Sequence, residues 1–243
     1  MQKRKVQLFV TCLVDQFFPE VAEATCEILH RLGVEVKTPL NQTCCGQPAF
    51  NDGLFSDARK VARQFLKAFK EEIPIVAPSG SCVHMVRHQY PVLFKGEPEE
   101  ELALSVSRRT FELTEFIVNV LGVDDLNSFY PHKVTYHASC HMTKGLRIVD
   151  PPLRLLKKVK GLEFLPMKNA DWCCGFGGVF AVKYPELSVA ILEDKVRWIS
   201  ESGAQVVTSC DVSCLMHIEG YLRRNKIPVR AEHIALILRG EKS

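Results

Sequence analysis

One arrangement of cysteines occurs twice in this 243-residue chain. In each half a single cysteine is followed by a Cys-Cys-Gly triplet and then by one or two further cysteines. The positions are Cys12, Cys44, Cys45 and Cys82 in the first half, and Cys140, Cys173, Cys174, Cys210 and Cys214 in the second. Two matched sets of this kind are typical of thiolate sites that hold metal, so the fold must bring their loops together twice.

The repeat extends beyond the cysteines. Lys5–Cys12 aligns without gaps with Lys133–Cys140, and the two triplets follow at nearly the same separation. Internal repeats of this length arise when a whole structural unit is copied. The sequence therefore predicts two homologous domains, residues 1–125 and 126–243, related by an approximate twofold axis.

The composition is ordinary for a globular protein, with 47% hydrophobic and 24% charged residues. The formal net charge is only +3 and the positive residues are scattered, so no nucleic-acid partner is expected. No apolar run approaches the roughly 20 residues that span a bilayer, so no transmembrane segment is expected. Val6–Val10 has an internal copy, which argues against a signal peptide, and ten cysteines without an export signal predict a reducing, cytoplasmic location.

Hydrophobic periodicity predicts alternating strands and helices in both halves. The expected strands are Val6–Val10, Val34–Val36 and Ile73–Ala77, then Val134–His137, Leu162–Leu165 and Val206–Thr208. The expected helices are Pro19–Leu32, Asp57–Phe69, Pro152–Val159 and Pro185–Ile199, with an apolar helix closing each half. This order predicts an α/β fold of two tandem Rossmann-like domains, each a parallel sheet with helices on both faces. A charged stretch, residues 95–107, is expected on the surface.

The repeated cysteines all follow the C-terminal ends of predicted strands. Ligands of open parallel sheets bind at that edge, so the loops of each half could converge on one point. Cys26 differs, because it lies within a predicted helix and Arg154 occupies the matching position of the second half. We expect Cys26 to be a buried structural thiol.

Adjacent cysteines fit the tetrahedral chelation of one zinc ion poorly, whereas an iron–sulfur cluster offers several irons to neighbouring thiolates. The residues therefore favour iron–sulfur over zinc, with a redox-active vicinal disulfide as a third possibility. His137 and His141 flank Cys140 and are candidates to donate toward sulfur. The glycines of the segment 175–178 are expected to let the backbone pass close to a cluster.

The doubled pattern resembles the cysteine-rich domain shared by several redox proteins. These are the B subunit of heterodisulfide reductase, the iron–sulfur subunits of glycolate oxidase and anaerobic glycerol-3-phosphate dehydrogenase, and the lactate utilization protein A family. Residues 171–178 and 211–220 resemble the last family throughout. The glycolate oxidase and glycerol-3-phosphate dehydrogenase subunits carry a ferredoxin-like segment ahead of this region, whereas here one predicted strand precedes Cys12.

The resemblance implies 4Fe–4S clusters on the nine repeated cysteines. In heterodisulfide reductase B subunits each half ends in Cys-x-x-Cys and is associated with noncubane clusters, whereas here Ser79 precedes Cys82 and Asp211 precedes Cys214 at that spacing. Cluster type, cubane or noncubane, and the role of Cys210 therefore stay open.

The resemblance also implies a function, that of an iron–sulfur electron-transfer subunit in a cytoplasmic complex that oxidises L-lactate to pyruvate. Its companions would be a ferredoxin-type iron–sulfur protein and a third subunit. We assign no catalytic residue to this chain, because it shows no flavin or nicotinamide motif. The alternatives are a thiol–disulfide oxidoreductase subunit of the heterodisulfide reductase type and a zinc-stabilised binding module.

Overall fold

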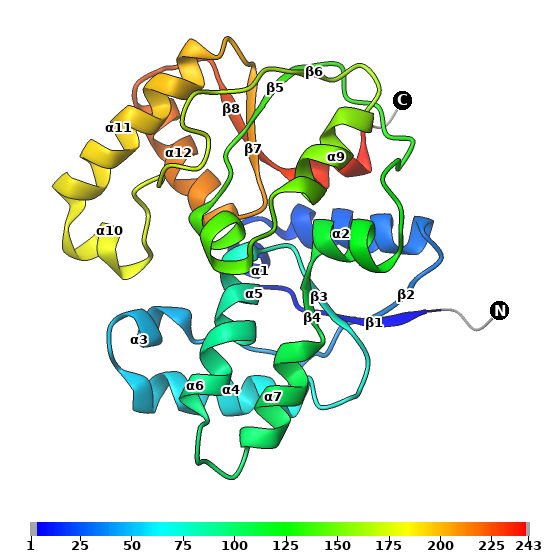
Figure 1. Ribbon diagram of the computed structural model, residues 1–243. Helices are drawn as coiled ribbons and strands as arrows, with labels where there is room; N and C mark the ends of the chain where they lie inside the picture. Colours follow the sequence, from blue (N-terminus) through cyan, green and yellow to red (C-terminus); the bar gives the residue numbers. More distant parts are fainter. Residues whose placement is uncertain (1–3, 242–243) are drawn as a thin grey trace. The chain divides into compact units, whose positions relative to one another are not determined.

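A computed structural model, which describes residues 4–241, contains two four-stranded parallel sheets with helices around them (Figure 1). The strand orders are β2-β1-β3-β4 and β6-β5-β7-β8. Contacts divide the chain into two compact units between Phe116 and Ile117. The predicted α/β class and its duplication are therefore confirmed, and each unit is described separately below.

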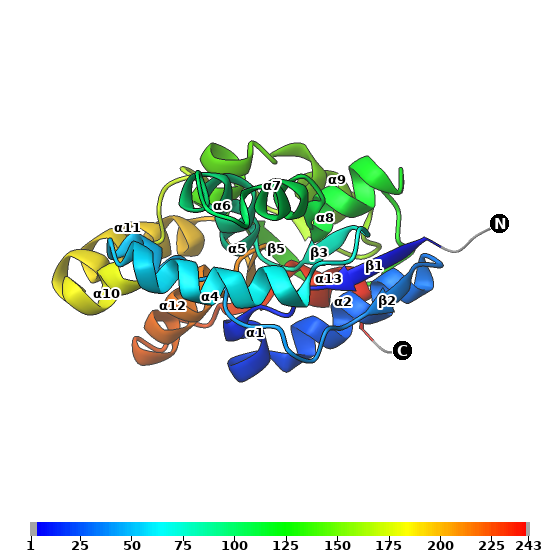
Figure 2. The same cartoon turned by 90° about the horizontal axis from the view of Figure 1, so that it is seen from below.

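The first unit alternates strands with helices along the chain. Its elements are β1 (Lys5–Leu8), α1 (Cys12–Phe17), α2 (Pro19–Arg31), β2 (Glu35–Lys37), α3 (Gln47–Asn51), α4 (Phe55–Ala68), β3 (Ile75–Ala77), α5 (Gly80–His84), η1 (a π-helical turn, Met85–Gln89), α6 (Tyr90–Leu93), α7 (Glu100–Arg108), β4 (Thr110–Glu112) and α8 (Leu113–Glu115). Strand β1 pairs with β2 on one side and β3 on the other. The crossovers therefore run in opposite directions from β1, which places α2 on one face and α4, α6 and α7 on the other (Figure 1 and Figure 2).

Aromatic rings fill the core of the first unit. Phe9, directly after β1, lies edge-on to Phe65 of α4 with ring centroids 4.8 Å apart, and Phe65 stacks on Phe69 at 4.4 Å. All three rings are fully buried. Helix α4 forms here because Ala58, Ala62 and Phe65 recur on one face, and burying that face stabilises it.

The second unit repeats the plan. Its elements are η2 (Phe116–Val120, spanning the boundary), β5 (Lys133–Tyr136), η3 (a π-helical turn, His141–Leu146), α9 (Asp150–Lys158), β6 (Glu163–Phe164), α10 (Val179–Lys183), α11 (Pro185–Glu201), β7 (Val206–Ser209), α12 (Val212–Arg224), β8 (Arg230–His233) and α13 (Ile234–Arg239). Strand β5 lies between β6 and β7, as β1 lies between β2 and β3. Helix α9 covers one face of the sheet, whereas α11 and α12 lie on the other (Figure 1).

The fourth strand of each sheet, β4 and β8, was not expected from the sequence. Their sequences are Thr-Phe-Glu and Arg-Ala-Glu-His, which lack the apolar run of a buried strand. Both lie at a sheet edge, where pairing on one side suffices. The stretch 95–107, expected on the surface, instead forms most of α7, and Ala103, Val106 and Ser107 bury one face of that helix.

Among residues 4–241, no helix combines the length and the apolar character that crossing a bilayer requires.

Glu112, at the end of β4, gives a prediction about stability. Its buried carboxylate accepts hydrogen bonds from the backbone N–H groups of Thr114 and Glu115, yet burial raises its pKa to about 7. The folded state therefore binds a proton at Glu112 more tightly than the unfolded state. The contribution of Glu112 to stability falls as pH rises from about 4.5 to about 7, by at most about 1.4 kcal/mol per pH unit.

We expect Glu112→Gln, which keeps an acceptor oxygen but cannot ionise, to flatten this dependence. Urea unfolding of both proteins across this pH range measures it. Equal slopes in wild type and variant would contradict the assignment.

Two candidate metal centres

In both units the repeated cysteines lie at the C-terminal ends of three strands that lie side by side. In the first unit Cys12 begins α1 after β1, Cys44 and Cys45 occupy the loop after β2, and Cys82 lies in α5 after β3. The crossovers leave β1 in opposite directions at this edge, which is the usual ligand position in open α/β sheets. The structure thus places the cysteines at the predicted edge.

Four of the five cysteines of the first unit, Cys12, Cys44, Cys45 and Cys82, form a continuous chain of thiol contacts, which we call the first centre. The Sγ atoms of Cys12 and Cys44 are 3.6 Å apart, Cys44 also contacts Cys45, and Cys45 contacts Cys82. Cys45 is buried, and the other three are half-buried.

Thiol contacts separate the pKa values of the first centre. Contact with Cys12 and then Cys45 lowers the pKa of Cys44 to about 3, whereas contact with Cys44 raises the pKa of Cys12. Contacts with Cys44 and Cys82, together with burial, raise the pKa of Cys45 well above its usual range. Protons are thus retained on some thiols to stabilise neighbouring thiolates, and a metal that binds here must displace them.

The second unit brings together Cys140, Cys173, Cys174 and Cys214, which we call the second centre. Cys140 contacts Cys173, Cys173 contacts Cys174, and Cys174 contacts Cys214. These cysteines follow β5, β6 and β7, which are the counterparts of β1, β2 and β3. The two centres are therefore built in the same way.

The pKa pattern of the first centre recurs in the second. Contact with Cys140 and then Cys174 lowers the pKa of Cys173 to about 2, whereas contact with Cys173 raises that of Cys140. Contact with Cys174 is the largest cause that lowers the pKa of Cys214 to about 6, and His137 lowers it further. The lowered pKa values favour anionic sulfur in both centres, and thiolate is the form that binds metal.

The glycine of each Cys-Cys-Gly triplet has a steric role. Gly46 and Gly175 have φ angles of +84° and +86°, and their backbone N–H groups donate to the Sγ of Cys44 and Cys173 at 3.4 and 3.3 Å. A Cβ on Gly175 would lie 2.3 Å from the carbonyl oxygen of Ser188 in α11. For Gly175 the expected close approach of the backbone is therefore to a helix, which holds the cysteine loop against the unit.

Cys210 and Cys26 lie outside the two chains of contacts just described. Cys210 is fully buried directly after β7, and its Sγ lies 3.5 Å from the hydroxyl of Tyr136. Its assignment as a ligand stays a prediction. Cys26 lies in α2 as expected, but it is half-buried rather than buried, and partial burial followed by the charge of Glu27 raises its pKa.

The histidines that flank Cys140 differ in their surroundings. His137 is fully buried, and one of its ring nitrogens lies within 4.8 Å of the Sγ atoms of both Cys174 and Cys214. The Nδ1 of His141 lies 3.8 Å from the Sγ of Cys140. The structure therefore places both rings beside sulfur.

Two polar groups near the second centre were missed by the sequence analysis. Lys195 of α11 is fully buried, and Asp211 accepts a hydrogen bond from Ser139 at 2.5 Å. A signal for Lys195 existed, because it lies in the apolar stripe of α11 formed by Leu192, Val196 and Ile199. A charged residue in such a stripe indicates a specific buried partner.

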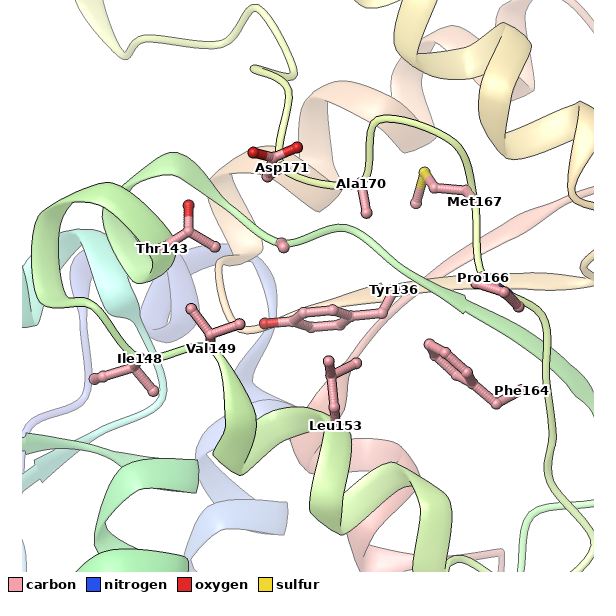
Figure 3. Close-up of a pocket in the computed structure, with 11 residues that line it drawn as sticks. Tyr136, Thr143, Ile148, Val149, Leu153, Phe164, Pro166, Met167, Ala170 and Asp171 are labelled. Carbon is pink, nitrogen blue, oxygen red and sulfur yellow. The ribbon is translucent and has the colours of Figure 1, made fainter.

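A cavity of about 410 Å³ lies beside the second centre, at the C-terminal ends of β5 and β6. Figure 3 shows the Tyr136 ring extending through the middle of the lining residues, with its hydroxyl toward Val149. The lining is largely apolar; its polar side chains come from Tyr136, Thr143 and Asp171, and no lysine or arginine contributes. The cavity therefore offers no positive group to a small carboxylate.

A second cavity, of about 290 Å³, adjoins Cys12 and Cys44 of the first centre. Its lining includes Asp15, Gln16 and Gln42, so it is more polar than the cavity beside the second centre.

Residues 6–87 and 134–219 both match the cysteine-rich domain family named CCG. The chain is 48% identical to lactate utilization protein A of Geobacillus thermodenitrificans, over 96% of this chain and 98% of that protein. It is 46% identical to lactate utilization protein A of Oceanobacillus iheyensis, over 96% of each chain. This chain belongs to the lactate utilization protein A family.

A solved structure shares the fold of this lactate utilization protein A family member. The crystal structure of a hypothetical protein from Helicobacter pylori superposes with a TM-score of 0.64 at 13% identity, covering 100% of this chain and 50% of that one. At this low identity the likeness concerns the fold alone.

The donor atoms of both centres suit a thiolate-bound metal group. Soft thiolates select iron–sulfur clusters or zinc, and the backbone N–H groups of Gly46 and Gly175 already donate to sulfur as they would to a metal-bound thiolate. Both ring nitrogens of His137 are buried without a hydrogen bond of normal geometry. One of these nitrogens lies within 4.8 Å of the Sγ atoms of Cys174 and Cys214, which supports a bound group at the second centre.

Gly175 provides a test of how the loop is held. Alanine at Gly203, which also has a positive φ but has nothing within 4 Å of its Cβ position, should cost roughly 1–2 kcal/mol of unfolding free energy. Alanine at Gly175 should cost more, because its Cβ would clash with the backbone of α11. Urea unfolding of Gly175→Ala and Gly203→Ala compares them, and equal losses would show that α11 does not constrain the loop.

Proposed function

We propose that this chain is the iron–sulfur electron-transfer subunit of a cytoplasmic complex that oxidises L-lactate to pyruvate. The observation that carries the proposal is the pair of four-cysteine centres, in a chain that belongs to the lactate utilization protein A family. Cys12, Cys44, Cys45 and Cys82 hold one 4Fe–4S group and Cys140, Cys173, Cys174 and Cys214 hold another, with Cys210 a further candidate ligand beside the second.

The chemistry that such groups supply is the acceptance and release of single electrons. The residues around each group set its reduction potential. Gly46 and Gly175 donate N–H groups to sulfur, which stabilises added negative charge. The buried positions of Cys45 and Cys174 keep water from part of each centre, which favours the less charged oxidation state.

The substrate is assigned to the complex as a whole. Removing hydride from a 2-hydroxy acid requires an acceptor such as a flavin or a nicotinamide, and recognising the carboxylate commonly uses an arginine pair. The apolar cavity beside the second centre has neither lysine nor arginine in its lining. We therefore assign lactate binding to a companion subunit and electron transfer to this chain, with a ferredoxin-type protein and a third subunit as partners.

A zinc-stabilised binding module is the second candidate, and one observation favours it. His137, Cys174 and Cys214 present ligand atoms that all lie within 4.8 Å of one another, so they could supply three ligands of one tetrahedral zinc ion. Iron, zinc and acid-labile sulfide analysis of anaerobically purified protein decides between the candidates. Zinc without sulfide would reject the iron–sulfur proposal.

The ligand assignment gives a matched pair of cysteine variants. Cys26 lies in α2 and is absent from the contact chain of the first centre, whereas Cys173 joins Cys140 to Cys174 in the second. We expect Cys26→Ala to keep the wild-type iron content and Cys173→Ser to lose most of the iron of the second centre. Iron analysis after anaerobic reconstitution measures both, and an equal loss in the two variants would refute the assignment.

The division of labour is tested with the isolated chain. After cluster reconstitution we expect no L-lactate oxidation by this subunit alone, and dye reduction only when the partner proteins are added. Cys174→Ser should abolish that activity, because losing a thiolate ligand changes the charge and coordination of the group. Co-purification with the partners shows whether assembly survives. Sustained lactate turnover by the single chain would show that it contains a complete active site.

A further inference from the structure

The two centres differ in the residue behind the cysteines. Because Lys5–Cys12 aligns without gaps with Lys133–Cys140, His137 occupies the position of Phe9. Both residues directly follow the central strand of their sheet and both are fully buried. The fold therefore accepts an apolar ring at this position. Packing alone does not explain why the second unit has a histidine there, because phenylalanine fills the same position in the first unit.

A second exchange lies on the neighbouring helix. The glycine of each triplet approaches one helix carbonyl, Ala58 for Gly46 and Ser188 for Gly175, which aligns α4 with α11. In this alignment Lys195 occupies the position of Phe65.

Phe9 and Phe65 pack edge to face in the first unit. Their counterparts in the second unit are a histidine and a lysine. An apolar pair has thus been exchanged for two polar side chains on the same side of the cysteine loops.

The buried ring of His137 contacts sulfur, and its hydrogen-bonding contact with the Cys214 thiol is one cause of the lowered pKa of that thiol. Its Nδ1 and Nε2 are both inaccessible to solvent, and neither makes a hydrogen bond of normal geometry. One of its nitrogens lies within 4.8 Å of the Sγ atoms of Cys174 and Cys214, where a metal atom could contact all three.

Lys195 adds positive charge on the same side. Its Nζ donates to the carbonyl oxygens of Asn169 and Ala170 at 2.7 and 3.2 Å, which lie just before the cysteine pair of the second centre. It also lies 5.6 Å from the centre of the Trp198 ring. These contacts fix a buried ammonium beside the loop that carries Cys173 and Cys174.

We propose that His137 is a nitrogen ligand of the metal group at the second centre, beside Cys174 and Cys214, and that Lys195 is its buried counter-charge. The second centre is then a mixed nitrogen and sulfur site with one ligand more than the four of a cubane cluster. The first centre, with Phe9 and Phe65 in the matching positions, has neither group. The inference deepens the proposed function and rests on it for the identity of the metal. It requires only that the second centre bind a metal group.

Asp211, whose side chain has the opposite formal charge, lies three residues before Cys214 of the second centre and accepts a hydrogen bond from Ser139. Ser79 is its counterpart in the first unit, where it accepts a hydrogen bond from the backbone of Cys82. The experiments below therefore replace His137 and Lys195 one at a time, and they measure the nitrogen coupling and the midpoint potential of the second centre.

The ligand role of His137 is tested by pulsed electron paramagnetic resonance of the full-length, anaerobically reconstituted chain. We expect nitrogen coupling of the strength that a directly bound imidazole gives, shifted when the protein is labelled with ¹⁵N-histidine. His137→Phe, which introduces the residue found in the first unit, should remove this coupling. His137→Gln should remove it too, and this second variant serves as the test if His137→Phe does not fold.

His141→Phe is the matched control, since that ring lies 3.8 Å from the Sγ of Cys140. The nitrogen coupling should survive this change. Its absence from the wild-type protein, or its loss only in His141→Phe, would overturn the assignment of His137.

The charge role of Lys195 is tested by redox titration of the same protein. We expect Lys195→Met to lower the midpoint potential of the second-centre signal, because removing a positive charge disfavours the added electron, and to leave the first-centre signal unchanged. The exposed Lys157→Met is the control and should shift neither signal. If the midpoint potential of the second-centre signal is unchanged in Lys195→Met, Lys195 is not the counter-charge of that centre.

Metal analysis separates this inference from the proposed function. If the purified chain holds zinc and no iron, the electron-transfer function fails, yet X-ray absorption at the zinc edge still reports the ligands. A nitrogen ligand that disappears in His137→Phe would uphold the mixed site, whereas sulfur ligands alone would reject it.

Discussion

The parallel pairing of β1 with both β2 and β3 is the constraint on which the first centre depends, and the pairing of β5 with β6 and β7 has the same role in the second. Parallel neighbours end at the same edge of a sheet, so three loops leave each unit side by side. Each loop carries a cysteine or a cysteine pair, and the thiols meet there. The edge strands β4 and β8 extend the sheets without contributing a cysteine.

Packing of the Cys-Cys-Gly loop determines which way its sulfur atoms point. The loop passes so close to helix α11 that no side chain fits at Gly175, and the same glycine turns its N–H group toward the Sγ of Cys173. A residue without a Cβ and with a positive φ meets both demands. The triplet is thus a structural device for presenting two adjacent thiols, independent of which metal they bind.

Duplication has produced two units with the same plan and different chemistry. The first unit fills the space behind its cysteines with Phe9, Phe65 and Phe69. The second places His137 and Lys195 at two of the corresponding positions and buries both. Buried polar groups are costly unless they are paired, so their presence in one copy only indicates a task that the other copy lacks.

Short-range patterns in the sequence were sufficient to predict the class of fold, the duplication and the convergence of eight of the nine repeated cysteines. These patterns are apolar strands, amphipathic helices and cysteines placed after strand ends. The sequence did not reveal β4 and β8, whose edge position removes the need for an apolar run. Tertiary structure alone decided that the Tyr136 hydroxyl faces Cys210, that Cys26 is only half-buried and that Lys195 is enclosed. Burial and contact at these positions depend on residues far away in the chain, and no local pattern encodes them.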